Sequence, residues 1–315
     1  MKQYSKIEKE LIEDFASNGY SGRKIATLLG LSKSGINDYL KNLSAGLFKS
    51  KSKDGPRILV FDLETAAALA YAFGRFKVNL SQDNIHTEGG WILCASWTWL
   101  GSGKVESMHL TPTEVVTQND SRIANKLWEL FEQADAVVAH NSKGFDWPVL
   151  QARTLYHDLP PLPTVKVLDT LLLARKYLKL PSNKLDSIGE YFGIGRKNST
   201  GGIKLWADVQ SGDAQAMKTM VEYCKQDVEL LLGVYLKLRA LGTAGSAFNA
   251  GLYYNDDLLR CGTCGSTSIE STGRTAVTSV NAFDEYRCND CGAVHRSRSN
   301  NLSKSKRKAL LAVAS

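Results

Sequence analysis

The sequence lacks several features that would place it in a specialised class of protein. No run of apolar residues approaches the roughly 20 residues that a membrane-spanning helix needs. The first residues, Met1 to Lys6, lead into a charged segment and not into the apolar core of a secretory signal. We therefore expect a cytoplasmic protein that makes no contact with a membrane.

Acidic residues are absent from the C-terminal end of the chain. Residues 292–315 carry six basic side chains and no acidic one. Residues 1–57 carry 11 basic and six acidic side chains, and the whole chain has a net charge of +7, which leaves −4 for the middle. Positive ends around an acidic centre suit a protein that grips a polyanion, and nucleic acid is the obvious candidate.

Cysteine is scarce, with six residues in the chain, and four of the six form two close pairs. Two residues separate the cysteines of each pair, and 23 residues separate the pairs. In a chain without an export signal this spacing favours a metal site over disulfides. Four thiolates on two turns make a closed tetrahedral zinc site with a structural role. The predicted Zn²⁺ ligands are Cys261, Cys264, Cys288 and Cys291.

The segment around these cysteines resembles a zinc ribbon, which we place at residues 258–297, with a strand at Ser279 to Arg287. Residues 296–308 are basic and low in complexity, which predicts disorder, and residues 298–315 form a basic tail. The other two cysteines, Cys94 and Cys224, are expected to pack as small apolar side chains.

A short apolar run ends in two carboxylates. Ile58 to Phe61 follows Gly55-Pro56 and predicts a buried strand. Asp62 and Glu64 come next, one residue apart, so strand alternation points them to the same side. Like charges this close repel, and a hard divalent cation such as Mg²⁺ or Mn²⁺ would relieve the repulsion. By itself the triplet also fits a strand that ends in a polar turn.

Two later motifs add further acidic residues. In His140-Asn141-Ser142-Lys143-Gly144-Phe145-Asp146, a strand ends and Asp146 lies at the start of a helix. Taken singly, this aspartate fits a helix cap or a first-turn residue. Tyr223 and Asp227 are four apart in a long helical pattern that we place at about Gly212 to Leu241, so they share one helix face. Asp169 is expected to cap another helix.

Together the three motifs resemble the DnaQ-like (DEDDy-type) 3′–5′ exonucleases. Asp62-Leu63-Glu64 is similar to the first motif of that family, Asn141-x-x-x-Phe145-Asp146 to the second and Tyr223-x-x-x-Asp227 to the third. The tyrosine form of the third motif is shared with the proofreading domains of family B DNA polymerases. The layout is also similar to exonucleases encoded by bacteriophages, and in that case the compartment would be the bacterial host cytoplasm.

The resemblance implies an α/β domain at residues 57–245 with an RNase H-like mixed sheet flanked by helices. It implies that four carboxylates hold two divalent cations, Mg²⁺ or Mn²⁺, and that Tyr223 orients the attacking water. It also implies that Asn141 contacts nucleic acid. The implied metal ligands are Asp62, Glu64, Asp146 and Asp227.

The N-terminal residues 1–45 are predicted to form three helices, followed by a polar, basic linker at residues 46–56. The helices are expected at Lys6 to Ser17, Gly22 to Leu29, and from the cap Ser32 to about Leu43. The spacing of Ala26, Gly30 and Ile36 resembles a DNA-binding helix-turn-helix. Its third helix would enter the major groove and present Ser32, Lys33, Ser34 and Asn37. The alternative is a helical bundle that only packs on the next domain.

Two segments allow more than one interpretation. Residues 66–90 interleave aromatic and basic side chains, including Tyr71, Phe73 and Phe76, which could stack on single-stranded bases. A helix and loop that pack on the sheet fit this segment equally well. Ile203 to Trp206 is expected to be a loop that borders the site.

The leading hypothesis for function is a 3′–5′ exonuclease that acts on nucleic acid, with DNA favoured over RNA. Replication or recombination proteins are candidate partners. The alternative is a DNA-binding regulatory or recombination protein, built from the terminal modules around an inactive RNase H-like core. An RNase H-like transposase or resolvase would also carry such modules, but it would not use this combination of acidic motifs.

Overall fold

The computed structural model describes residues 4–17, 21–47, 55–74, 76–196, 201–243 and 246–312. The chain divides into two compact units, Met1–Ser52 and Lys53–Ser315. Among the described residues, no helix combines the length and the apolar character needed to span a bilayer.

The first unit consists of three helices, α1 (Lys6–Ser17), α2 (Gly22–Leu29) and α3 (Lys33–Leu47). Ile12, Ile25 and Ile36, one from each helix, are fully buried against one another. Gly30 ends α2 with a φ of 65°, a conformation that glycine adopts without steric cost. The helix starts agree with the prediction. However, α3 continues four residues past its predicted end because Ser44 to Leu47 contains no proline and includes strong helix formers.

The predicted linker at residues 46–56 therefore begins inside α3, and its residues 48–54 lie outside the described part of the chain. The same holds for Gly19-Tyr20, where a break between the first two helices is expected, and for Arg75 in the aromatic segment.

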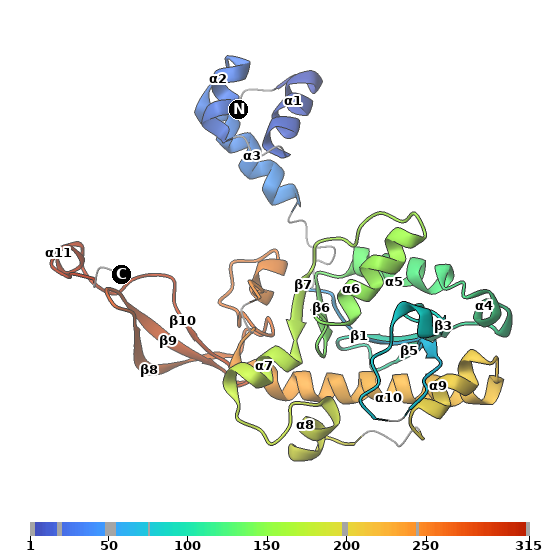
Figure 1. The fold of residues 1–315 in the computed structure, drawn as a ribbon. Coiled ribbons are helices and arrows are strands. Elements are labelled where there is room, and N and C mark those ends of the chain that lie inside the picture. The colour runs from blue at the N-terminus through green and yellow to red at the C-terminus, as the bar shows by residue number, and fades with distance from the viewer. Residues whose placement is uncertain are drawn as a thin grey trace. The chain divides into compact units, whose positions relative to one another are not determined.

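The second unit is built on a five-stranded sheet in the order β5-β4-β1-β6-β7 (Figure 1). β1 pairs antiparallel with β4 and parallel with β6, and the sheet is therefore mixed. β7 was not predicted, because Lys-Val-Leu-Asp is too short and too polar at its ends to stand out in the sequence. The strands are β1 (Ile58–Thr65), β4 (Ile92–Trp99), β5 (Glu106–His109), β6 (Ala136–Ala139) and β7 (Lys166–Asp169).

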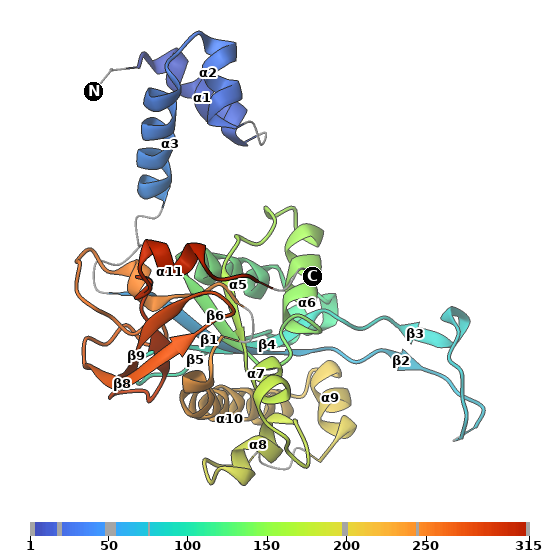
Figure 2. The same cartoon turned by 90° about the vertical axis from the view of Figure 1, so that its left-hand side faces the viewer.

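Helices cover both faces of this sheet, which confirms the predicted mixed α/β, RNase H-like fold class (Figure 2). Leu59 and Phe61 of β1 pack with the side of the core that holds α5 and α6. Ile58 and Val60 alternate with them and pack against α7, α8 and α10. The helices of this unit's core are α4 (Pro112–Thr117), α5 (Ser121–Gln133), α6 (Asp146–Tyr156), α7 (Thr170–Tyr177), α8 (Leu185–Tyr191), α9 (Ile203–Gln210) and α10 (Ala214–Leu238).

Residues 203–206, which we predicted to form a loop, are the first turn of α9. Leu205 and Val209 lie four residues apart and are buried, so one face of this segment packs as a helix. The preceding glycines, Gly201 and Gly202, both have a φ of 74°, which supports a turn before the helix and not a longer loop.

Residues 66–90 form an arm that extends from the sheet (Figure 2). Its two short strands, β2 (Leu69–Ala70) and β3 (Ile85–Thr87), pair antiparallel, and a 3₁₀ turn, η1 (Gln82–Asn84), precedes β3. Tyr71, Phe73 and Phe76 are 68%, 107% and 89% exposed. The alternative of a helix and loop packed on the sheet is therefore wrong for the described residues of this segment.

The C-terminal part of the second unit is a three-stranded sheet in the order β10-β9-β8. A strand was expected at Ser279 to Arg287, and β9 covers most of that range. The predicted disorder of residues 296–308 is wrong. Backbone hydrogen bonds of 2.8 Å tie Ser297 to Asp284 and Asn301 to Ala282, and Ser303 caps a short helix. The elements are β8 (Ile269–Val277), β9 (Ala282–Cys288), β10 (Val294–Arg296) and α11 (Lys304–Lys308).

Candidate active site

Three carboxylates meet where α10 crosses β1. Asp62 and Glu64 leave β1 on the same face, opposite Ser96 and Cys94 of β4. α10 packs on β1 and β4 and brings the buried Asp227 to this face. One carboxylate oxygen from each of the three residues lies within 4.8 Å of the others. The structure thus joins two motifs that are about 160 positions apart in the chain.

This donor set fits a divalent cation. Oxygens that bind one Mg²⁺ at about 2.1 Å lie at most about 4.2 Å apart, and the three oxygens here, all within 4.8 Å of one another, are compatible with that geometry. Carboxylate oxygens are also the ligands that Mg²⁺ and Mn²⁺ prefer. Without a cation, three converging carboxylates beside a buried strand would repel one another.

Tyr223 precedes Asp227 by one helical turn on α10. Asp213 caps this helix by accepting hydrogen bonds from the Gln215 and Ala216 backbone, which fixes the start of its 25 residues. The Tyr223 ring packs edge-on against Trp206 of α9, with 6.4 Å between ring centroids. The segment expected to border the site therefore does so through Trp206, although as a helix.

The side chain of Cys224 contacts Asp62. Its sulfur is 3.6 Å from the Asp62 backbone oxygen and 3.8 Å from Asp62 Oδ2. Burial, reinforced by the neighbouring thiol of Cys94, raises the pKa of Cys224 well above its usual value. Cys94 and Cys224 are both fully buried, as the sequence predicts. The contact of Cys224 with Asp62 was not predicted from the sequence.

Asp146 is not part of the group whose oxygens lie within 4.8 Å of one another. It is buried at the start of α6, where burial first and the negative charge of Asp169 second raise its pKa to about 7. Asp169 accepts hydrogen bonds from the backbone of Leu171 and Leu172, which confirms that it caps α7. It also accepts one from the Asn141 backbone at 3.0 Å.

Asn141 has a φ of 69°, which asparagine tolerates better than most residues. This conformation turns the chain sharply between the end of β6 and the start of α6. A β-carbon at Gly144 would lie 2.8 Å from Asn141 Oδ1, so a larger residue there would displace the Asn141 side chain. The second motif is thus a compact turn, and it leaves the Asn141 side chain exposed.

A buried ionic network stabilises α6, and the sequence analysis did not find it. Asp120 accepts hydrogen bonds from Arg153 Nε at 2.7 Å, Arg153 Nη2 at 2.6 Å and the Ile92 backbone at 2.7 Å. His157 Nε2 lies 2.6 Å from the same carboxylate. Burial alone would raise the pKa of Asp120, but these partners together lower it. Arg153 and His157 lie 33 and 37 positions after Asp120 in the chain, so no local sequence pattern indicates this contact.

The four cysteines of the two pairs converge beside the three-stranded sheet, in the segment predicted to be a zinc ribbon, with their sulfurs within 4.8 Å of one another. Cys261 and Cys291 are 3.6 Å apart, and so are Cys264 and Cys288. A disulfide would bring two sulfurs to about 2.05 Å, whereas tetrahedral Zn²⁺ with bonds of about 2.3 Å separates its sulfurs by about 3.8 Å. The distances therefore fit a Zn²⁺ site and do not fit a disulfide between Cys261 and Cys291 or between Cys264 and Cys288.

His295 of β10 adjoins this cluster, with Nε2 3.1 Å from Cys261 Sγ. Burial opposes ionisation of Cys261, but His295 and two backbone N–H groups lower the pKa of its thiol to about 5. Burial raises the pKa of Cys291 to about 11, and the charge of Cys261 adds to the effect. The His295 contact was not predicted, because the sequence analysis considered only cysteine spacing.

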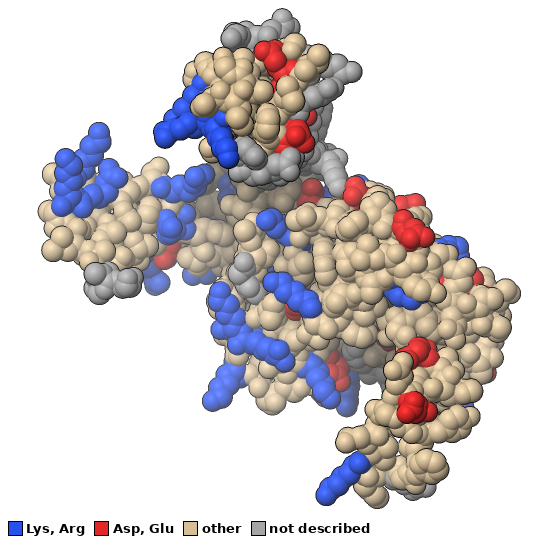
Figure 3. All heavy atoms as spheres, turned by 45° about the horizontal axis from the view of Figure 1, so that its top comes forward, with Lys and Arg blue, Asp and Glu red and all other residues tan. Residues whose placement is uncertain are grey.

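The residues predicted to contact nucleic acid are exposed. Lys33, Ser34 and Asn37 lie at the start of α3 in the first unit. In the second unit, basic side chains gather on the lower left of the body in Figure 3, the side on which Figure 1 places α7. Asn141 is exposed at the end of β6.

A comparison with protein families agrees with the fold. Residues 92–239 match the family described as the RNase_H superfamily. This range contains Asp146, Tyr223 and Asp227 but begins after β1, so it does not include Asp62 and Glu64.

Among solved structures, 148 chains match. One of them is the family B DNA polymerase from the hyperthermophilic archaeon Pyrobaculum calidifontis, with 16% identity and a TM-score of 0.44. The match covers 60% of this chain and 26% of that chain, about a quarter of the polymerase. No curated protein sequence matches the chain. The family match and the mixed sheet agree with an RNase H-like fold, and the match covers residues 92–239.

Proposed function

We propose that this protein is a metal-dependent nuclease, and more specifically a 3′–5′ exonuclease that acts on DNA. The observation that carries the proposal is the convergence of Asp62, Glu64 and Asp227 from β1 and α10 within 4.8 Å. A regulatory protein with an inactive core would have no need for three mutually repelling carboxylates on one face of its sheet. The three acidic motifs and the RNase_H superfamily match support the same assignment.

In this proposal, Asp62, Glu64 and Asp227 hold one cation, and Asp146 completes the ligands of a second. Two bound divalent cations would supply Lewis-acid stabilisation of the scissile phosphate and of the leaving oxygen. Asp146 must be ionised to take part, and positive charge beside it would lower its raised pKa. Tyr223 lies on the same face of α10 as Asp227, and its ring packs against Trp206 of α9. Its hydroxyl would orient the attacking water.

The other modules fit the handling of nucleic acid. We assign Lys33, Ser34 and Asn37 of α3 to contact with duplex DNA, because they are exposed at the start of the third helix. The ribbon would hold a structural Zn²⁺ through Cys261, Cys264, Cys288 and Cys291. Replication or recombination proteins remain the candidate partners.

The test is digestion of 5′-labelled DNA and RNA, single- and double-stranded, with Mg²⁺ or Mn²⁺, followed by resolution of the products. A 3′–5′ exonuclease shortens the labelled strand one nucleotide at a time, and excess EDTA stops it. Asp227→Asn should lose activity roughly 10⁴-fold, because a metal site is worth several kcal/mol in the transition state. Glu222→Gln is the matched control, since Glu222 is exposed on α10 and pairs with Lys225.

Full activity in EDTA, or equal activity of Asp227→Asn and the wild type, would overturn the metal assignment. Internal cuts without a ladder from the 3′ end would keep the nuclease and reject the exonuclease. Duplex binding without any hydrolysis would favour a regulatory protein with an inactive core.

A further inference from the structure

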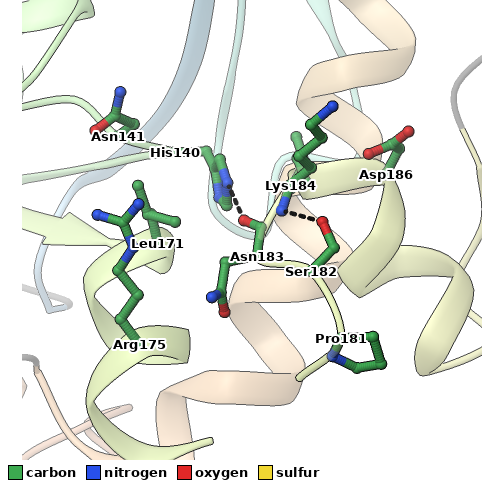
Figure 4. Close-up of a pocket in the computed structure, with 10 residues that line it drawn as sticks. His140, Asn141, Leu171, Arg175, Pro181, Ser182, Asn183, Lys184 and Asp186 are labelled. Carbon is green, nitrogen blue, oxygen red and sulfur yellow. Dashed lines mark hydrogen bonds between the residues drawn. The ribbon is translucent and has the colours of Figure 1, made fainter. Parts of the chain in front are cut away.

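We propose that an open pocket beside the carboxylates binds the backbone phosphates of a single nucleic-acid strand that extends from the scissile bond. This inference rests on the proposed nuclease function and adds a second subsite to it. The pocket has a volume of about 680 Å³. The end of β6, α7 and the segment that leads into α8 surround it (Figure 4). Its polar lining consists of His140, Asn141, Arg175, Ser182, Asn183, Lys184 and Asp186.

The pocket begins at the end of β6, the strand that pairs with β1, and β1 carries Asp62 and Glu64. Val60 of β1 pairs in parallel with Val138 of β6, and Asp62 and His140 each follow two residues after this pair, His140 just past the end of β6. Alternation places both side chains on the sheet face of Val60 and Val138, which packs against α7, α8 and α10. Neighbouring strands lie about 4.8 Å apart, so the pocket begins close to the carboxylates. A strand with one phosphate at Asp62 would therefore meet this pocket next.

The charge of this wall suits a polyanion. Residues 170–185 contain four basic side chains and no acidic one. Two of the four, Arg175 and Lys184, line the pocket from opposite walls, on α7 and before α8. One carboxylate, Asp186, also borders it, and this group accepts a hydrogen bond of 2.8 Å from the Ser187 backbone. In Figure 4 Lys184 lies between His140 and Asp186. The two cations, Arg175 and Lys184, outnumber the one carboxylate, so the pocket lining has a net positive charge.

The walls are held in place before any ligand binds. His140 Nδ1 is 2.9 Å from Thr170 Oγ1, and its Nε2 is 3.0 Å from the Asn183 backbone oxygen. One imidazole thus connects the end of β6 to α7 and to the segment before α8. Leu171 and Leu185 are buried behind the two walls. Binding would need to order only the ends of Arg175 and Lys184, which lowers the entropy cost of a phosphate contact.

The lining also indicates what part of the strand is recognised. The described residues around the pocket include no phenylalanine, tyrosine or tryptophan on which a base could stack. The ring nitrogens of His140 already have partners. Apart from the Asp186 carboxylate, the remaining groups are cations, amides and the Ser182 hydroxyl, and these can donate hydrogen bonds to phosphate oxygens. The pocket is therefore expected to bind backbone without preference for base sequence.

Substitutions in the full-length chain test the pocket. Arg175→Ala, Lys184→Ala and the double variant are compared with Lys104→Ala. The control lies in the β4–β5 turn, at the edge of the sheet opposite β7. Binding of short fluorescent single strands of DNA and of RNA is measured by anisotropy across salt, with Ca²⁺ in place of Mg²⁺. The double variant should bind roughly tenfold more weakly, and its salt slope should fall by about 0.7 for each phosphate that the protein no longer neutralises.

Hydrolysis separates this subsite from the metal site. The double variant should show a raised KM for an oligonucleotide. Its kcat/KM for the p-nitrophenyl ester of thymidine 5′-phosphate should not change, since that substrate contains only the scissile phosphate. Equal weakening of DNA and RNA binding would support recognition of phosphate alone, and weakening of one would support the pocket and assign it to that nucleic acid.

Wild-type affinity and wild-type salt slope in the double variant would overturn the proposal, because the cations would then only be solvated. An equal weakening by Lys104→Ala would overturn it as well, because any surface cation would then have the same effect. If the wild-type chain hydrolyses neither substrate, the nuclease function fails, while the anisotropy result still decides whether the pocket binds a strand.

Discussion

The carboxylate cluster and the cysteine cluster differ in what holds them together. The carboxylates of Asp62, Glu64 and Asp227 lie on β1 and α10, between two large groups of buried apolar residues. The cysteines lie on turns of a small sheet whose buried hydrophobic group is Cys261, Cys288 and Ala293. The first cluster can therefore form without its cations. The second has too little apolar core to do so and would depend on metal to fold.

The clusters also differ in chemistry. Four soft thiolates around Zn²⁺ fill a tetrahedron and leave no position for substrate. Three hard carboxylates leave coordination positions on Mg²⁺ for water and a phosphate oxygen. On the proposed function, the thiolate site would have a structural role and the carboxylate site a reactive one.

Removal of zinc should have the largest effect, because it should unfold the cysteine cluster and leave the carboxylate cluster intact. Strong chelation should release about one Zn²⁺ per chain and unfold the ribbon, because zinc binding contributes about 10–16 kcal/mol in such modules. Hydrogen exchange of the amides of β8 and β9 should accelerate. None of the six tryptophans lies after residue 206, so the thermal transition of tryptophan fluorescence reports the core and should not move. Zinc that remains bound after both cysteine pairs are replaced by serine would contradict the assignment.

Asp120→Asn should test whether the core alone supports the carboxylate site. The substitution removes the charged partner of Arg153 in a buried network and should lower the free energy of unfolding by about 3–5 kcal/mol. Denaturant unfolding followed by tryptophan fluorescence measures the decrease, and exchange in the ribbon should change little. Asp208→Asn is the control, because Asp208 forms an exposed pair with Lys204. Equal stability of Asp120→Asn and the wild type would argue against the network.

The same network predicts the response of the core to acid. The pKa of Asp120 in the folded protein is lowered from its usual 3.8. The stability it contributes is therefore present above pH 3.8 and is lost as the pH falls through the lowered folded-state value. In Asp120→Asn this part of the acid dependence should disappear.

Tyr223→Phe should separate cation binding from turnover at the carboxylate site. The substitution removes the hydroxyl but keeps the ring that packs on Trp206. We expect kcat to fall roughly 10- to 1000-fold, an extrapolation from the size of general acid–base effects. The Mn²⁺ concentration for half-maximal activity should stay the same. A shift in that concentration with unchanged kcat would instead place Tyr223 among the groups that organise the metal site.

The smallest expected effect concerns the first unit. Lys33→Ala should weaken binding of the full-length chain to duplex DNA and reduce the salt slope by about one unit, provided that Lys33 contacts a phosphate. Lys9→Ala on α1 is the control, because Lys9 is also exposed in the first unit. Cleavage of short single strands should be the same in both variants. Equal duplex binding by Lys33→Ala and the wild type would favour a packing role for these helices.

Local patterns in the sequence determined most of the elements. The apolar run before Asp62 predicted β1, and the caps Ser21 and Asp169 marked helix starts, because each signal involves residues a few positions apart. The spacing of the cysteines likewise predicted that four sulfurs could surround one ion. Long-range partners left no such signal, so the Asp120 network, the contact of Cys224 with Asp62 and β7 were found only in the structure.

The sequence by itself supplied the chemical groups and the secondary structure that carries them. It placed Asp62 and Glu64 on one face of a strand and Tyr223 and Asp227 on one face of a helix, because both periodicities are local. Only the tertiary structure decided that α10 crosses β1 and joins these faces, and that Asp146 lies outside the 4.8 Å group. Likewise, only the pairing of β1 with β6 brought the end of β6 beside Asp62 and opened a basic pocket there. Those contacts depend on how apolar faces bury against one another across the whole domain, and no short stretch of sequence encodes them.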